Sequence, residues 1–385
     1  MSNQQKIHAA RQAIIGARRV VVKVGSGILV NQDHHLDEDR IGALVEDLVA
    51  LRESGVQVIL VSSGAVAAGA PMMGLEKQDK TIPQKQACAA LGQTRLMALY
   101  ERLFSLHGYH AAQILLTQDD VRNRERYLNA KNTFQTLLSA GILPVVNEND
   151  SVVVEEIKFG DNDNLSAQVA ALVQADLLLL LSSVGGFYEK KLAEVKENEK
   201  PVTVVEQITE DHFRHVQDQE TGNRITTGGM KSKLLAIQKA AQYGLPSILA
   251  NGLSKGIVPR IFKGEEEGTL FLAQEEGLSA RKHWILHSLI PQGSLTVDDG
   301  ALQAIVKQGK SLLPIGITAV SGDFHSGNAV QVLGPDGTEV ARGLSNYGSN
   351  EVQVIQGRKS REIKSLLGYS YYDEVIHRDD LVLLK

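Results

Sequence analysis

Cysteine is almost absent from this chain, which has 385 residues and a single cysteine, Cys88. One cysteine excludes an intramolecular disulfide and any metal cluster built from several thiolates. Cys88 lies in an alanine-rich stretch with helical character, so we expect a small buried hydrophobic residue rather than a nucleophile. The 11 histidines are scattered without metal-ligand spacing, and no Ser/His/Asp triad is legible. We therefore expect neither a metal held by protein ligands nor a catalytic triad.

Long apolar runs are also missing. The densest, at residues 177–181, is far shorter than the ~20 residues that a membrane-spanning helix requires. The first 19 residues are polar and basic, and the apolar run at 20–24 is interrupted by Lys23. A secretory signal has a different pattern. These features predict a cytoplasmic protein.

Neither sign of charge dominates the composition. The chain has 40 Lys and Arg residues against 45 Asp and Glu residues, a formal net charge of -5. This balance argues against a chain-wide electrostatic grip on nucleic acid. Hydrophobic residues make up 43% of the chain and charged residues 22%, which is typical of a packed protein. At about 150 residues per domain, the length suggests two or three domains.

The first two thirds of the chain alternate between strand and helix patterns. The run at 19–24 is β-branched and nearly continuous, which is typical of a strand buried on both faces of a parallel sheet. The alternation predicts an α/β domain with a mostly parallel central sheet. We expect strands at 19–24, 56–61, 111–116, 142–146, 177–181 and 247–250, and helices at 38–54, 84–106, 124–140, 165–174 and 230–243.

The character of the sequence changes near residue 275. Short β-like segments at 294–297, 317–321, 329–333 and 340–344 are separated by turn residues and interrupted by one helix at 298–308. Such spacing predicts a small β-barrel. We therefore expect a first domain at 1–275, a linker at 276–290 and a second domain at 291–385.

Two glycine- and serine-containing loops follow the first two strands, where an open parallel sheet binds its ligands. Residues 23–27 read Lys-Val-Gly-Ser-Gly. A lysine near the end of a buried strand is costly unless it meets an anion, and glycines let backbone N–H groups approach phosphate. Residues 62–65 read Ser-Ser-Gly-Ala before a helix, a second candidate anion site. An incidental lysine remains an equally good interpretation of the first loop, and a simple helix cap remains an equally good interpretation of the second.

Two tetrads of acids and amides follow, at 147–150 (Asn-Glu-Asn-Asp) and 161–164 (Asp-Asn-Asp-Asn). Carboxylates and amides bind ammonium groups, Mg²⁺ or other polar ligands. The spacing excludes an EF-hand, which needs a glycine and a glutamate at fixed loop positions. We interpret both tetrads as functional.

A fifth loop, at 226–233 (Thr-Thr-Gly-Gly-Met-Lys-Ser-Lys), enters a helix whose first turn carries lysines. Lysine opposes the helix dipole at an N-terminus, and a bound phosphate would relieve that conflict. Backbone anion sites, two separated lysines and clustered aspartates together suit phosphoryl transfer, which needs electrostatic stabilisation and little covalent work by the protein.

These motifs also carry a resemblance. KVGSG, SSGAVAAG, PVVNENDSV, KFGDNDNLSA and TGGMKSK have the order and spacing of the glutamate-phosphorylating members of the amino acid kinase family. LTVDDGA, SLLPIGI and HRDD resemble the PUA-type domain of bacterial members. The resemblance spans about residues 19–380. It implies a three-layer αβα amino acid kinase fold followed by a small PUA-like β-barrel.

The resemblance implies ATP-dependent phosphorylation of the side-chain carboxylate of L-glutamate to L-glutamyl 5-phosphate, the first step of proline biosynthesis. It also implies Mg²⁺, feedback inhibition by L-proline, and a homodimer or homotetramer. Two alternatives remain open. Another member of the family would phosphorylate a different carboxylate or a phosphate. An additional RNA-binding role would use the second domain, where a solvated helix face explains the basic residues as well: Lys307, Lys310, Arg342, Arg358, Lys359, Arg361 and Lys364.

The resemblance also implies roles for single residues. Lys23 and Lys233 would flank the transferred phosphoryl group, and Asp163 would hold both lysines as the third catalytic residue. Ser63, Asp150 and Asn162 match the positions that bind glutamate. Ser182 and Ser183 stand where the family usually has Thr-Asp. The nucleotide-binding residues would be Lys23, Ser182, Ser183, Thr227, Gly228, Gly229, Met230, Lys231, Ser232 and Lys233.

Overall fold

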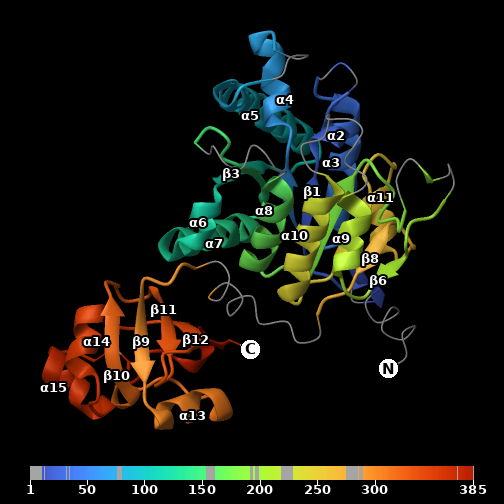
Figure 1. The fold of residues 1–385 in the computed structure, drawn as a ribbon. Helices are drawn as coiled ribbons and strands as arrows, with labels where there is room; N and C mark the ends of the chain where they lie inside the picture. Colours follow the sequence, from blue (N-terminus) through green and yellow to red (C-terminus); the bar gives the residue numbers. More distant parts are fainter. Residues whose placement is uncertain are drawn as a thin grey trace. The chain divides into compact units, whose positions relative to one another are not determined.

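The computed structural model describes residues 11–12, 14–31, 33, 35–75, 80–152, 161–190, 194–195, 199–217, 229–274, 285, 289–370 and 372–384. The chain forms two compact units (Figure 1). One comprises residues 1–118 and 129–277, and the other comprises residues 119–128 and 278–385. Over the described ranges, every helix is too short or too polar to cross a membrane.

An eight-stranded sheet forms the centre of the first unit. Its strands are β1 (Arg19–Val24), β2 (Gln57–Ser62), β3 (Ala111–Leu116), β4 (Leu143–Glu148), β5 (Leu177–Ser182), β6 (Val204–Val205), β7 (Ser247–Asn251) and β8 (Thr269–Phe271). Their order is β3-β4-β2-β1-β5-β7-β8-β6. From β3 to β7 in this order, each strand is parallel to the next, and β8 runs antiparallel to β7. The predicted mostly parallel sheet is confirmed.

Helices cover both faces of this sheet, which makes three layers. The helical segments of the first unit are α2 (Ser26–Leu29), α3 (Glu38–Glu53), α4 (Ala65–Gly69), η1 (Ala70–Met73), α5 (Ile82–Ser105), α7 (Arg124–Ser139), α8 (Asp161–Leu172), α9 (Glu210–Gln217), α10 (Met230–Gln242) and α11 (Ile257–Phe262). Nearly all of α6 (Gln118–Arg122) and the first residues of α7 belong to the second unit. Apolar residues of α3, α5 and α11 pack with one face of β1, β2, β4, β5 and β7. Helix α8 contacts β1, β2, β4 and β5 and packs beside α10.

The structure corrects the boundary of one predicted helix. Sequence periodicity places a helix at 165–174, whereas α8 begins at Asp161. Asp and Asn are favoured at helix starts, because their side chains satisfy free backbone N–H groups and their charge suits the helix dipole. The second acid/amide tetrad is therefore the first turn of α8 rather than a loop. Likewise, Asn147 and Glu148 of the first tetrad complete strand β4.

The second unit contains a mixed sheet of five strands with the order β10-β9-β11-β12-β13. Its elements are β9 (Gly293–Val297), α13 (Asp299–Gln308), η4 (Pro314–Gly316), β10 (Ile317–Gly322), β11 (Ala329–Leu333), β12 (Glu339–Leu344), α14 (Ser349–Ile355), η5 (Ser360–Glu362), α15 (Ile363–Leu367), η6 (Arg378–Asp380) and β13 (Leu381–Leu383). A separate apolar core holds this unit together. The small β-barrel predicted from the sequence is thus recorded as a mixed sheet of five strands. Most of the proposed linker at 276–290 lies outside the described residues, so its bounds stay a prediction.

Two glycines let helices α4 and α5 touch backbone to backbone. A Cβ atom at Gly69 would lie 1.9 Å from the carbonyl oxygen of Cys88, and one at Gly92 would lie 1.8 Å from that of Ala65. No side chain fits at such distances. This close contact fixes α5 against the segment that follows β2.

We therefore expect Gly92→Ala to destabilise the protein by about 1–3 kcal/mol, the usual cost of overpacking. The melting temperature measures the effect. Gly42→Ala in α3 is the matched control, because nothing lies within 4 Å of a Cβ at Gly42. In an open helix interior, alanine is favoured over glycine by about 0.5–1 kcal/mol. Equal melting temperatures for the two variants would contradict the close contact.

Candidate active site

The candidate site lies at the carboxyl-terminal edge of the parallel strands around β1. Strand β1 is flanked by β2 and β5, with Val24 opposite Ser62 on one side and Leu181 on the other. Strands β2, β3 and β4 lie on one side of β1, and the later strands, from β5 onward, lie on its other side. The order of the strands therefore reverses at β1, which makes this strand the switch point of the sheet. Open α/β sheets bind ligands in the crevice at this point. The segments after β1, β2, β4 and β5 therefore meet at one edge.

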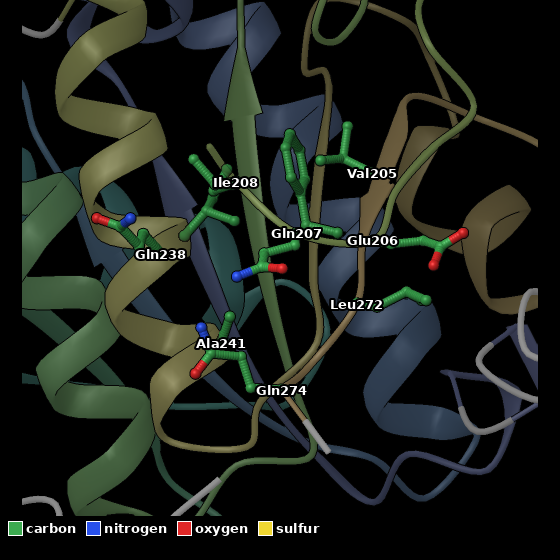
Figure 2. Close-up of a pocket in the computed structure, with 10 residues that line it drawn as sticks. Val205, Glu206, Gln207, Ile208, Gln238, Ala241, Leu272 and Gln274 are labelled. Atoms are coloured by element: carbon green, nitrogen blue, oxygen red, sulfur yellow. The ribbon is translucent and has the colours of Figure 1, made fainter. Parts of the chain in front are cut away.

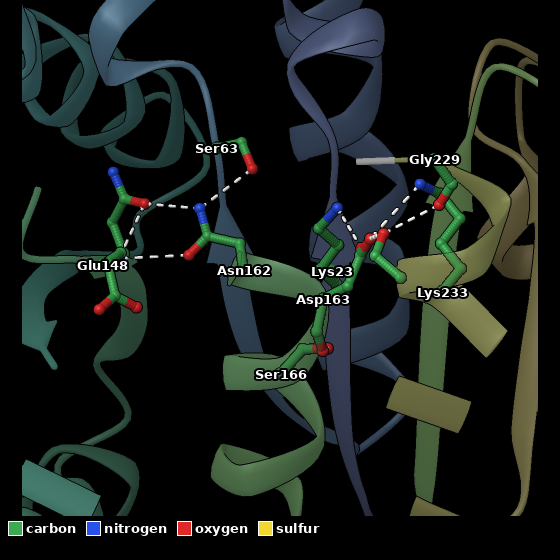
Figure 3. A network of polar contacts seen from close by, with 10 residues as sticks. Lys23, Ser63, Glu148, Asn162, Asp163, Ser166, Gly229 and Lys233 are labelled. Atoms are coloured by element: carbon green, nitrogen blue, oxygen red, sulfur yellow. Dashed lines mark hydrogen bonds and ion pairs between the residues drawn. The ribbon is translucent and has the colours of Figure 1, made fainter. Parts of the chain in front are cut away.

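A buried ionic cluster joins three elements at this edge (Figure 3). Asp163, in the first turn of α8, has no exposed surface. Its Oδ1 forms an ion pair with Lys23 Nζ from β1. Its Oδ2 lies 3.4 Å from Lys233 Nζ of α10 and accepts a hydrogen bond of 2.7 Å from Ser232 Oγ. Both lysine side chains are themselves buried.

The charges in this cluster do not balance. Burial raises the pKa of Asp163, but the neighbouring charges of Lys23 and Lys233 outweigh it and hold the pKa below its usual value. The carboxylate is therefore ionised at neutral pH. Burial lowers the pKa of Lys233, and the charge of Lys23 adds to this effect, whereas Asp163 opposes it. Two ammonium groups against one carboxylate leave an excess positive charge that suits an anionic ligand.

A second cluster, made of amides and a hydroxyl, lies beside the first. Asn162 Nδ2 donates to Ser63 Oγ at 3.0 Å and to Asn147 Oδ1 at 2.8 Å. Asn162 Oδ1 accepts a hydrogen bond of 3.2 Å from the backbone N–H of Glu148. The two tetrads of the sequence are thus joined directly. Asp150 lies half-buried in the turn after β4.

Helix α8 connects the two clusters through consecutive residues. Figure 3 shows Asn162 pointing toward Ser63 while Asp163 points toward Lys23 and Lys233. One side of the helix start therefore presents hydrogen-bonding groups, and the other presents buried positive charge. This arrangement can hold a polar substrate next to a phosphate.

Comparison with known proteins agrees with this geometry. Residues 18–251 match the model of the amino acid kinase family, and residues 293–367 match that of the PUA domain. The chain belongs to the amino acid kinase family. The family and the three-layer fold inferred from the sequence motifs are thereby confirmed.

Relatives of this kinase chain match over nearly its whole length. A protein of Trichlorobacter lovleyi named glutamate 5-kinase is 51% identical over 367 residues, which cover 95% of this chain and 97% of that protein. Proteins with the same name from Geobacter sulfurreducens and Syntrophus aciditrophicus are 48% and 44% identical. The match to the Geobacter sulfurreducens protein covers 95% of this chain and 98% of that protein, and the match to the Syntrophus aciditrophicus protein covers 97% of this chain and 96% of that protein.

The residues that this kinase family would use for the nucleotide are described in part. Thr227 and Gly228 lie outside the described residues. Gly229 is the N-cap of α10 and its carbonyl accepts a hydrogen bond of 2.8 Å from Ser232 Oγ. Met230 begins the helix, and Lys231 is exposed. Ser182 ends β5, where its carbonyl accepts from the N–H of Gly252 at 2.8 Å, and Ser183 is exposed.

Sequence reasoning missed one member of the amide cluster. Asn147 Nδ2 donates to Gln93 Oε1 at 2.8 Å, and Gln93 lies on α5, far from both tetrads in the sequence. A glutamine within an alanine-rich helix carries no local signal of such a contact. Only the fold, which packs α5 against β3 and pairs β3 with β4, brings the two amides together.

A small pocket lies elsewhere on the first unit (Figure 2). Residues of α10 beyond Lys233 line it together with residues of β6, β8 and the segments after these strands: Val205, Glu206, Gln207, Ile208, Ile237, Gln238, Ala241, Phe271, Leu272 and Gln274. It contains none of the predicted site residues, and we assign it no role in the kinase reaction.

Proposed function

We propose that this chain is a glutamate 5-kinase. It transfers the γ-phosphoryl group of ATP to the side-chain carboxylate of L-glutamate and forms L-glutamyl 5-phosphate, the first step of proline biosynthesis. Close relatives of that name match both domains. The observation that carries the chemistry is the buried cluster of Lys23, Asp163 and Lys233 with its excess positive charge.

The chemistry of the reaction fits these residues. The side-chain carboxyl of glutamate has a pKa of about 4.3 and is ionised at neutral pH, so no general base is required. The main obstacle is repulsion between the attacking carboxylate and the phosphate oxygens. Two fixed ammonium groups offset that repulsion and stabilise the charge of the transition state. We assign Lys23 and Lys233 to this role and Asp163 to holding them in place.

The amide cluster would bind the amino acid. We assign Ser63, Asn162 and Asp150 to the glutamate site. The hydroxyl and amide groups suit the carboxylates of glutamate, and the acidic side chain of Asp150 suits its ammonium group. The nearness of Asn162 to Asp163 would place the substrate next to the cationic cluster.

Mg²⁺ is expected to enter with the nucleotide. Among the residues described, no group of three or more His, Cys, Asp or Glu side chains could hold a metal ion. Asp163 is already engaged by two lysines and Ser232. Mg²⁺ commonly keeps several waters and binds through substrate phosphates, which it neutralises. Lys23, Ser182, Ser183 and the segment 227–233 would bind the ATP. Feedback inhibition by L-proline, a homodimer or homotetramer, and a cytoplasmic location remain predictions.

ADP release in the presence of ATP and Mg²⁺, with hydroxylamine to trap an acyl phosphate, tests the proposed reaction. We expect ADP release to depend on L-glutamate and to be accompanied by glutamyl hydroxamate. N-acetylglutamate, aspartate and UMP are the comparison acceptors. Turnover with one of these, and none with L-glutamate, would instead assign the chain to another activity of the family.

RNA binding by the second unit stays a prediction. Arg342 forms an ion pair of 2.6 Å with Glu339, so its charge is partly offset. Lys307, Lys310, Arg358 and Lys359 are exposed. Retention of the whole chain on RNA at low salt, lost as salt increases, is the result that RNA binding requires.

A further inference from the structure

A chain of side-chain amides leads away from the glutamate site into the body of the first unit. Asn162 donates to Asn147, Asn147 donates to Gln93 at 2.8 Å, and Gln93 Nε2 donates to Gln113 Oε1 at 3.0 Å. This row of hydrogen-bonded amides passes from α8 through β4 and α5 to the edge strand β3. All its bonds run in the same direction, with each amide donating to the next.

This direction fixes the hydrogen bonding of Ser63. Asn147 Oδ1 accepts from Asn162 Nδ2 and also from the backbone N–H of Glu148 at 2.9 Å, which occupies its two lone pairs. Asn162 then uses both N–H groups, one on Asn147 and one on Ser63. Ser63 Oγ therefore accepts from Asn162, and within the described ranges its own proton has no acceptor and can donate to a carboxylate.

Gln93 is the residue that holds this order in place. Its Oε1 accepts from Asn147 Nδ2, so an Asn147 amide rotated by half a turn would face Gln93 acceptor to acceptor as well as Asn162 donor to donor. Gln93 is only 9% exposed. Its neighbour Gly92 lies against the backbone of Ala65 in α4, which leaves α5 little freedom to shift.

We infer that Gln93 is a positioning residue for the glutamate site: it fixes the Asn147 amide, which orients Asn162 and thereby the Ser63 hydroxyl. This inference rests on the proposed function. It adds a residue from a helix that contributes none of the assigned site residues. The bonds described connect the amide chain to Ser63, while Lys23 and Lys233 are held by Asp163. The effect should therefore fall on glutamate and not on ATP.

Gln93→Met tests this role, because methionine has a similar length and removes both polar atoms. It leaves the Asn147 N–H without its acceptor, and a lost bond of this kind raises the KM for glutamate by about tenfold or more. We expect the KM for ATP to stay within about twofold of wild type. Gln168→Met is the matched control. Gln168 is also a buried glutamine, on the later part of α8, and its Oε1 accepts no hydrogen bond in the described residues.

Gln93→Glu supplies the rescue. A carboxylate still accepts from Asn147, and the exposed Gln113 can turn its amide to donate to the second oxygen. We expect Gln93→Glu to recover most of the affinity for glutamate that Gln93→Met loses. Where Gln93→Met does not fold, Gln93→Asn replaces it, since its shorter amide falls short of Asn147.

The outcomes separate the inference from the proposed function. Glutamate turnover by the wild type, with an unchanged KM for glutamate in folded Gln93→Met, overturns only the inference. Equal increases in the KM for glutamate and ATP, or no recovery in Gln93→Glu, overturn it as well. A wild-type enzyme that does not phosphorylate glutamate overturns both.

Discussion

Replacing Lys23 with methionine is expected to lower kcat by about a hundredfold or more, the usual result of losing one preorganised charge at a transition state. Methionine keeps the apolar stem that fills the end of β1, and removes only the ammonium group. The cluster would then contain one lysine and one aspartate, with no excess positive charge. The kcat is measured as hydroxamate formation at saturating ATP and glutamate, in protein whose melting temperature shows that it is folded.

Lys263→Met is the control for this prediction. Lys263 is exposed at the end of α11, outside both clusters. Its removal changes the net charge by the same amount, so we expect an unchanged kcat. A folded Lys23→Met protein with a kcat within about threefold of wild type would remove Lys23 from phosphoryl transfer.

The six longer strands of the first sheet and its five longer helices could be predicted because their signals are local, whereas the two- and three-residue strands β6 and β8 were not predicted. The valine run of β1 is buried on both faces, and the three- and four-residue spacing of apolar side chains in α3 gives Ile41, Leu44, Val45 and Leu48 a common buried face. Each pattern depends only on neighbouring residues. The order of the eight strands does not, since it depends on which strand pairs with which.

The start of α8 shows where local reasoning failed. Aspartate and asparagine are common in loops as well as at helix starts. The apolar periodicity begins only at Leu165, so the polar tetrad gave no helical signal. In the structure its position in the first turn is what directs Asn162 and Asp163 toward different partners.

The site itself was predicted as a set of polar segments, and the partners within it required the fold. Lys23 lies 140 residues before Asp163 in the sequence, and Lys233 lies 70 residues after it. Parallel pairing brings β1 beside β2 and β5, and α8 and α10 pack side by side over this sheet. Only then do three distant residues form one buried cluster. The contacts of Gln93 could not be predicted from the sequence for the same reason, because its partners come from β3 and β4.

Asp163→Asn is expected to have opposite effects of pH on activity and on stability. The variant leaves two buried ammonium groups without their shared carboxylate, and breaking a buried ionic cluster in this way destabilises a protein by about 3–5 kcal/mol. The positions of both lysines are lost with it, so we expect kcat at neutral pH to fall by at least about a hundredfold.

The pH dependence follows from Lys233. Burial and Lys23 lower its pKa, and Asp163 is the group that raises it. Without Asp163 the pKa falls further, so the ammonium is lost at a lower pH than in the wild type. The alkaline decrease of the residual kcat should therefore move to lower pH. Stability should change in the other direction. Between the folded and the unfolded pKa of Lys233, the folded state binds fewer protons than the unfolded state. The melting temperature of Asp163→Asn should therefore rise relative to that of the wild type as pH increases through this range.

The wild type differs at the acidic end. The pKa of Asp163 is lowered in the folded state, so its contribution to stability is present above the unfolded pKa of about 3.9 and is lost as pH falls through the folded value. In Asp163→Asn this decrease in stability at acidic pH is absent, because the variant has no carboxyl group to protonate. Asp39→Asn, at an exposed position in the first turn of α3, is the control for removing one negative charge. Melting curves of Asp163→Asn and Asp39→Asn with the same pH dependence would mean that Asp163 does not hold the charge of the two lysines.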